Sequence, residues 1–150
     1  PLPDGVRLTR LDADEIPAAA QVLGSAFRDH HGDMAASPET IEHWMRGPSV
    51  RLDASFLARD DEGIVGVLLA EDGVDGGYVA ALGVERRGRG RGAGRALLAA
   101  SFDRFAQTGA PRVVLDVDAD NVTGATRLYE SAGMRRRLTQ ELWAVPLSQD

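Results

Sequence analysis

The chain contains no cysteine and no lysine, and only 5% of its 150 residues are aromatic. Without cysteine it cannot form a disulfide, a thiolate metal site or a thiol nucleophile. Without lysine it has neither a Schiff-base lysine nor the lysine with which a P-loop holds a transferred phosphate. No apolar run reaches the roughly 18 to 20 residues of a membrane span, and the start of the chain does not resemble a signal peptide. We therefore expect a cytoplasmic protein.

The charge of the chain is acidic overall but unevenly distributed. Arginine supplies all 17 basic residues, against 23 acidic ones, which gives a net charge of -6. Non-specific nucleic-acid binding needs a basic surface, so this balance argues against it. Five of the arginines, however, lie among glycines between Arg86 and Arg95. We call residues 86–95 the glycine-arginine island.

The apolar pattern predicts one domain over residues 1–150, which is about the usual domain length. Strands are expected where apolar residues alternate or run together, at 6–11, 55–59, 64–71, 78–84, 113–117 and 138–147. Helices are expected where apolar residues recur at helical spacing, from 12 to 29, 37 to 46, 96 to 106 and 121 to 132. The fold class is therefore α/β (α+β), a mixed sheet of six or seven strands flanked by about four helices.

The glycine-arginine island follows a predicted strand and opens a predicted helix. Closely spaced glycines let a backbone approach a ligand, and the amides of a helix N-terminus attract phosphate or pyrophosphate. The segment also fits the relaxed dinucleotide fingerprint Gly88-x-Gly90-x-x-Ala93, but that motif normally opens its domain, and only 62 residues follow Gly88. A solvated basic loop is the plain alternative. The strand-loop-helix context favours an anion cradle.

Two separate motifs resemble the GNAT superfamily of N-acyltransferases. Arg89, Gly92 and Gly94 fill the Gln/Arg-x-x-Gly-x-Gly/Ala signature of its acyl-CoA pyrophosphate loop. The second motif is a strand, an asparagine, and a helix with Leu-Tyr before a Gly-hydrophobic pair, here Leu115-Asp116-Val117, Asn121, Leu128-Tyr129 and Gly133-Met134. The order of elements agrees as well. The residues at 118–121 and 127–130 are similar to those of the mycothiol synthase-like branch, whose members carry two such domains.

The resemblance implies a mostly antiparallel sheet whose fourth and fifth strands splay apart to hold acyl-CoA. It implies acetyl-CoA as the acyl-donor substrate, with its pantetheine arm along the fourth strand and its pyrophosphate on the island. The residues implied in binding it are Leu82, Gly83, Val84, Arg89, Gly90, Arg91, Gly92, Ala93, Gly94, Arg95, Asn121 and Tyr129. For Asn121, a simple helix cap is the alternative.

Catalytic roles also follow from the resemblance. Tyr129 matches the tyrosine that protonates the departing CoA thiolate, a step that needs a donor within hydrogen-bond reach of the sulfur. The alternative is a tyrosine that only packs. Asp116 lies where ribosomal-protein N-acetyltransferases of the superfamily carry a glutamate, so it is a candidate base. Glu71 is a rival base, and a chain of waters is a third possibility.

The helix-loop-helix after the first strand forms the acceptor wall in this superfamily. It makes His30, His31 and Trp44 candidates for substrate contact together with Glu71, against ordinary packing. Adjacent histidines lack the ligand spacing of a dedicated metal site, so no metal is expected.

The leading hypothesis is an N-acetyltransferase that moves an acetyl group from acetyl-CoA directly to a primary amine of a small molecule or a protein N-terminus. The acidic net charge favours a cationic acceptor. The alternatives are a non-catalytic acyl-CoA-binding regulatory module and a general anion-binding domain. No nucleic-acid or membrane partner is expected. The last predicted strand ends at an edge, where a second copy could pair to form a homodimer.

Overall fold

The computed structural model describes residues 5–31, 37–74, 76–115, 124–131 and 133–134. The chain divides into two compact units, Pro1–Leu115 and Asp116–Asp150. Each unit is described by itself below.

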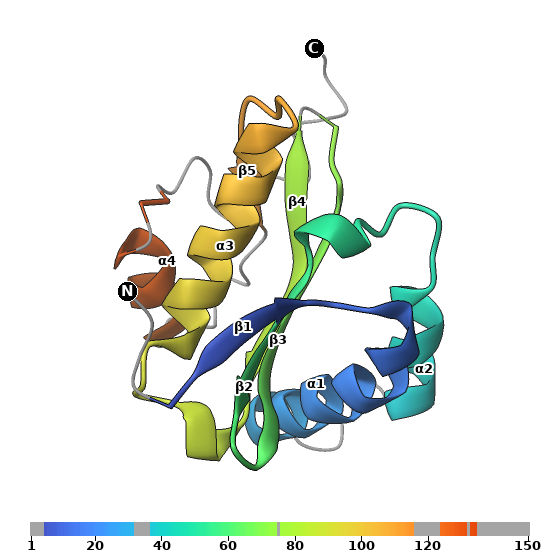
Figure 1. Cartoon of the computed structure of the whole chain (residues 1–150), viewed down its shortest axis with the longest axis vertical. Coiled ribbons are helices and arrows are strands. Elements are labelled where there is room, and N and C mark those ends of the chain that lie inside the picture. The colour runs from blue at the N-terminus through green and yellow to red at the C-terminus, as the bar shows by residue number, and fades with distance from the viewer. Residues whose placement is uncertain (1–4, 32–36, 75, 116–123, 132, 135–150) are drawn as a thin grey trace. The chain divides into compact units, whose positions relative to one another are not determined.

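The first unit is built on one sheet (Figure 1). Within the described residues its strands follow the order β1-β2-β3-β4-β5, with bounds Arg7–Arg10, Phe56–Asp60, Gly63–Asp72, Gly77–Val84 and Val113–Val114. β1 to β4 pair antiparallel, whereas β5 runs parallel to β4. The prediction of a mixed, mostly antiparallel sheet is confirmed. The strand predicted at 138–147 lies outside the described residues.

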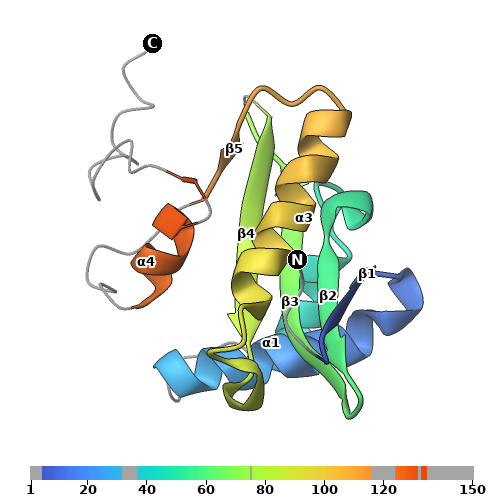
Figure 2. The ribbon, with the colours of Figure 1, turned by 60° about the vertical axis from the view of Figure 1, so that its left-hand side comes forward.

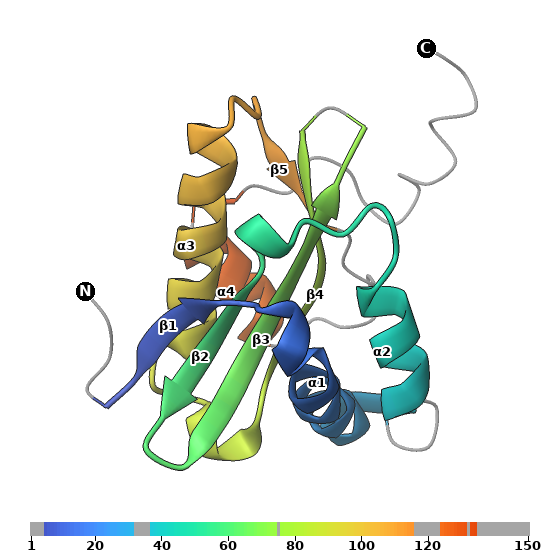
Figure 3. The same ribbon diagram turned by 45° about the vertical axis from the view of Figure 1, so that its right-hand side comes forward.

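Helices cover both faces of this sheet. The α-helices are α1 (Ile16–His31), α2 (Pro38–Met45), α3 (Ala93–Gln107) and, in the second unit, α4 (Gly124–Ser131). Short 3-10 turns are η1 (Ala13–Glu15), η3 (Leu52–Ala54) and η4 (Arg86–Gly88). Figure 3 shows α1 and α2 together on one face of the sheet and α3 on the other.

The sequence explains where α1 and α2 begin. Asp12 accepts a hydrogen bond from the amide of Asp14 (3.2 Å) and so caps η1, which leads into α1 with Pro17 in the tolerated first turn. Ser37 caps α2 by accepting from the amide of Thr40 (3.2 Å), with Pro38 at the first helical position. Both predicted starts are confirmed.

The end of α1 differs from the prediction. We expected the helix to end at residue 29, before His30 and His31, but α1 includes both residues. Histidine lowers helix propensity only slightly, so two histidines alone do not stop a helix that is held by its packed residues. The packed side of α1 consists of Ile16, Ala19, Ala20, Val22, Leu23 and Ala26, which are all buried.

The other face of the sheet approaches α3 most closely at Gly77. A Cβ atom on Gly77 would lie 2.7 Å from the ring of Phe105, which is fully buried in α3. No real Cβ tolerates that contact, so the strand or the ring would have to move. A glycine at this position therefore lets β4 and α3 pack together.

We expect Gly77→Ala to lower the free energy of unfolding by about 1 to 3 kcal/mol, the usual effect of overpacking. The matched control is Gly24→Ala inside α1, where the nearest atom to a new Cβ is the Pro38 Cγ at 3.4 Å, an ordinary contact. Alanine there should be neutral or stabilise by up to about 1 kcal/mol. Urea unfolding of both variants measures the difference, and equal midpoints would contradict the close approach of Phe105.

None of the helices in the described ranges combines the length and the apolar content that crossing a bilayer requires.

Candidate active site

Among the described residues, the edge of β4 that faces β5 is unpaired over most of its length. β5 pairs with β4 only at Gly77–Val113 and Tyr78–Val114, while β4 continues to Val84 (Figure 2). In the described residues, β4 beyond Tyr78 has no strand partner on its β5 side. The predicted arm-binding residues Leu82, Gly83 and Val84 all lie on this stretch. Its backbone groups are suited to pair with an extended amide-bearing ligand.

The turn that follows β4 is held in place by backbone hydrogen bonds. The Glu85 amide donates to the Val65 carbonyl (2.8 Å), and the Gly88 amide donates to the Glu85 carbonyl (2.8 Å). Gly88 is buried, and a Cβ on it would lie 3.0 Å from Val65 and 3.2 Å from Val84. Gly88 is therefore packed against β3, while the neighbouring Arg86 and Arg87 are exposed.

The second half of the island leads directly into α3. Gly90 and Gly92 have φ values of 78° and 80°, the left-handed region that favours glycine. Gly92 is the N-cap of α3, and its carbonyl accepts from the Ala96 amide (3.1 Å). A glycine N-cap has no side chain to cap the first amides of the helix. These amides, at the positive end of the helix dipole, are the expected place for an anion.

The arginines of the island have different roles. Arg87 donates to both oxygens of Asp60 (2.9 and 2.7 Å), and Arg91 donates to Asp60 Oδ2 (3.2 Å). Arg89 Nε donates to the Val84 carbonyl (2.9 Å), which ties its side chain to the end of β4. Arg95 is exposed and has no ion-pair partner among the described residues. Asp60, which sequence reasoning missed, thus anchors the island to the β2–β3 hairpin.

The hydrogen bond from the Arg87 guanidinium lowers the pKa of the Asp60 carboxyl to about 2, with smaller contributions from the Glu62 amide and Arg91. A depressed carboxyl pKa stabilises the fold above the unfolded-state value of about 3.9. That contribution is lost as the pH falls toward the folded-state value. The ion pairs of Asp60 with the arginines of the island, which we call the Asp60 clasp, are therefore present at neutral pH.

We expect Asp60→Asn to lower the urea midpoint of unfolding at pH 7, because Arg87 and Arg91 lose their shared carboxylate. The difference from wild type should shrink as the pH falls from about 4 to about 2. Asp61→Asn is the matched control, since Asp61 is exposed and has no arginine partner in the described part of the chain. An equal effect of the two substitutions would contradict the Asp60 clasp.

Two predicted substrate residues are brought together on the face of the sheet that α1 and α2 cover. Trp44, on α2, donates its indole N–H to Glu71 Oε2, on β3 (2.9 Å). Trp44 is 36% exposed. The sequence singled out both residues, but it did not predict that they are hydrogen-bonded.

The other predicted site residues lie at the end of α1, in the second unit or outside the described residues. His30 and His31 belong to the last turn of α1. Asp116 and Asn121 lie outside the described residues. Tyr129 is half-buried on α4 of the second unit, and burial raises the pKa of its phenol. Among the described residues, no three His, Asp or Glu side chains are grouped to hold a metal ion.

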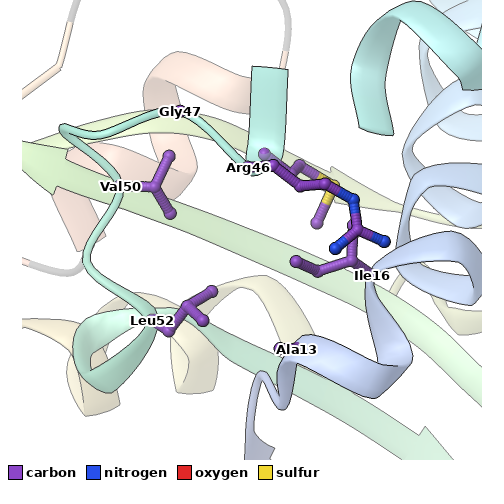
Figure 4. A pocket seen from close by; sticks show the side chains of 7 residues that line it. Ala13, Ile16, Arg46, Gly47, Val50 and Leu52 are labelled. Atoms are coloured by element: carbon purple, nitrogen blue, oxygen red, sulfur yellow. The ribbon is translucent and has the colours of Figure 1, made fainter. Parts of the chain in front are cut away.

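A shallow hollow of about 240 Å³ lies apart from the island (Figure 4). It is bounded by the start of α1, the end of α2 and the segment before η3, and it is lined by Ala13, Ile16, Met45, Arg46, Gly47, Val50 and Leu52. Arg46 is the charged residue of this lining, and its guanidinium reaches across toward Ile16. The lining contains no acid or base suited to acyl transfer.

Comparison with known proteins defines the class of this fold and site. The model of the acetyltransferase (GNAT) family matches residues 18–134. The chain therefore belongs to the GNAT acetyltransferase family, as its two motifs predicted. The family and the GNAT fold expected from the sequence are confirmed.

Individual relatives indicate which branch of the family the chain is similar to. The mycothiol acetyltransferase of Thermobispora bispora is 35% identical over 143 residues, which cover 90% of this chain and 48% of that protein. The chain spans about half the length of the curated relatives it matches. This similarity confirms a place near the mycothiol synthase-like branch.

Two solved structures show the same fold. A GCN5-related N-acetyltransferase from Sphaerobacter thermophilus has a TM-score of 0.73 and 30% identity, covering 90% of this chain and 42% of that one. A GNAT family acetyltransferase from Brucella melitensis, solved in complex with acetyl-CoA, has a TM-score of 0.70 and 17% identity, covering 87% of this chain and 83% of that one. The second likeness, at this identity, concerns the fold alone.

Proposed function

We propose that this chain transfers an acetyl group from acetyl-CoA to a primary amine. The observation that carries the proposal is the continuous path formed by the open edge of β4, the packed turn at Arg86–Gly88 and the uncapped N-terminus of α3. An extended arm with amides fits the strand edge, and a pyrophosphate fits the helix amides. Because the chain belongs to the GNAT acetyltransferase family, acetyl-CoA is the acyl donor that we propose for this path.

The reaction is a direct transfer. The lone pair of the neutral amine attacks the thioester carbonyl carbon, a C–N bond forms, and the C–S bond breaks with its electron pair going to sulfur. The amine nitrogen gives up a proton, and the CoA thiolate takes one up. In this proposal Tyr129 supplies the proton to the thiolate, while Asp116 or water accepts the proton of the amine. Burial, which raises the pKa of Tyr129, keeps its phenol protonated for that role.

The domain and the acceptor belong to the proposal as well. The family match at 18–134 crosses the boundary between the two units, which supports one GNAT-like domain over 1–150. The relatives are named mycothiol acetyltransferases, so a mycothiol-type amine is a first acceptor to test, beside other small amines and protein N-termini. A cytoplasmic location and a homodimer remain predictions from the sequence.

The absence of cysteine provides a clean test. A thiol-reactive dye detects released CoA, and this chain contributes no thiol of its own. Each candidate amine is mixed with acetyl-CoA and the chain, and amine-dependent CoA release is expected with at least one of them. Acetyl-CoA binding without release for any amine would favour the non-catalytic regulatory module. If acetyl-CoA does not bind at all, the proposed function is wrong.

A further inference from the structure

The Trp44–Glu71 pair has a fixed backbone beneath it. The end of β3 is bonded on both sides, to Tyr78 of β4 on one side and to the segment 49–51 on the other. On the second side, the Asp72 amide donates to the Ser49 carbonyl (2.9 Å) and the Arg51 amide donates to the Ala70 carbonyl (2.8 Å). With its backbone held this way and one oxygen accepting from the indole, the Glu71 carboxylate has a defined position.

Glu71 differs from the other carboxylates on the described strands. Asp60 pairs with Arg87 and Arg91, and Asp72 pairs with Arg51 (3.1 Å). Glu71 has no arginine or histidine within ion-pair distance in the described part of the chain, and its Oε1 has no hydrogen-bond partner there. It is a half-buried carboxylate with one oxygen that accepts no hydrogen bond from the described residues.

The pair also lies beside the opening of the sheet. Glu71 is directly opposite Tyr78, and Tyr78 is the last residue of β4 that pairs with β5. The open edge of β4 starts at the next residue. A group bound between Trp44 and Glu71 therefore lies at the closed end of the stretch proposed to hold the arm of acetyl-CoA, where the reactive end of that arm is needed.

We propose that Trp44 and Glu71 form an ammonium-binding subsite, which selects an acceptor in its protonated, cationic form. A carboxylate oxygen forms a charge-assisted hydrogen bond with an ammonium group, and an exposed indole attracts a cation through its ring. Glu71 supplies the charge that distinguishes an ammonium from a neutral group, while Trp44 both holds the carboxylate through its indole N–H and offers its ring to the cation. The bound ammonium gives one proton to water before the transfer, so that the neutral amine attacks, and its second proton leaves during the transfer as proposed above. This inference deepens the proposed function and rests on it for the identity of the site.

The indole N–H of Trp44 offers a direct readout. The chain has two tryptophans, so its proton-nitrogen correlation spectrum contains two indole signals, and the one that disappears in Trp44→Phe belongs to Trp44. Hexylamine and spermidine serve as cationic probes, and hexanol as the neutral match of hexylamine. Titrations are made with and without saturating CoA. We expect a saturable shift of the Trp44 signal with both amines and none with hexanol.

Glu71→Gln should move the Trp44 signal in the free protein and weaken amine binding at least about tenfold, the effect of one lost charge-assisted contact. Glu39→Gln, at an exposed carboxylate early in α2, removes the same charge and should change neither. Equal affinities of the two variants, binding of hexanol as tight as hexylamine, or no saturable shift with any amine would each overturn the subsite.

A parallel titration with acetyl-CoA separates this inference from the proposed function. A chain that binds amines through Glu71 but does not bind acetyl-CoA keeps the subsite and refutes the acetyltransferase proposal. A chain that binds acetyl-CoA and releases CoA with an amine, yet is indifferent to Glu71→Gln in both binding and KM, refutes the subsite alone.

Discussion

Acetyl-CoA affinity is expected to fall at least about 100-fold in the double variant Arg89→Glu, Gly92→Glu. Arg89 is tied to the end of β4 through Val84, and Gly92 caps α3 with a φ of 80°. The first substitution replaces a cation by an anion beside the proposed pyrophosphate. The second places another anion at the helix N-terminus, in a conformation that non-glycine residues adopt rarely. Losing two charge-assisted contacts of about 1.5 to 3 kcal/mol each accounts for the size of the effect.

Calorimetric titration with acetyl-CoA measures this effect. The matched control is Arg10→Glu, Gly109→Glu, which makes the same change of charge and also replaces a glycine of positive φ (88°), but at the opposite end of α3. Arg10 is an exposed residue of β1. The control should bind acetyl-CoA like the wild type. Equal losses in both double variants would mean that the charge or the stability of the chain, rather than the island, governs binding.

Turnover is expected to fall about 100-fold or more in Tyr129→Phe, while acetyl-CoA affinity stays within about twofold. General-acid catalysis contributes about 10² to 10⁴ to a rate, and the substitution removes only the proton donor. Burial raises the pKa of the Tyr129 phenol above its usual value of about 10, so the group remains protonated through neutral and mildly alkaline pH. The wild-type rate should therefore show no decline from tyrosine ionisation below about pH 10.

The measurement is CoA release against pH, with acetyl-CoA titrations on the same samples. Tyr78→Phe, the same change at the other tyrosine of the chain, is the comparison. If Tyr78→Phe abolishes turnover and Tyr129→Phe does not, the proton donor has been assigned to the wrong residue. If Tyr129→Phe loses acetyl-CoA affinity in step with turnover, the tyrosine binds the donor rather than protonating the thiolate.

The sequence predicted the context of the glycine-arginine island directly, but it suggested the roles of single residues only through resemblance to a family. The glycine-arginine island is contiguous, and its strand-before, helix-after context was readable from the order of residues. The structure confirms that context, with β4 ending at Val84 and α3 starting at Ala93 inside the island. The roles of Tyr129, Asp116 and Asn121 came from resemblance to a family, and they remain predictions.

Asp60 shows why other features were not predicted. It lies 27 residues before Arg87 and 31 before Arg91. The acidic turn 60–62 and the basic island suggest mutual attraction, and Glu62 Oε1 also lies 3.7 Å from Arg87, but the register of the β2–β3 hairpin places Asp60 within hydrogen-bond distance of both Arg87 and Arg91. A shift of one residue in that register would turn its side chain to the other face.

Sequence was sufficient for the family, through the resemblance of its two motifs, and for the mixed sheet and the strand-loop-helix context of the island, through local periodicity and glycine placement. Tertiary structure decided the long-range pairs: Arg87 and Arg91 on Asp60, and Trp44 on Glu71, which are 27 residues apart. A side-chain pair of that kind forms only if the packing of α2 on the sheet and the register of the strands place the two groups within hydrogen-bond distance of each other. No local pattern in the chain specifies a distance so short between residues so far apart.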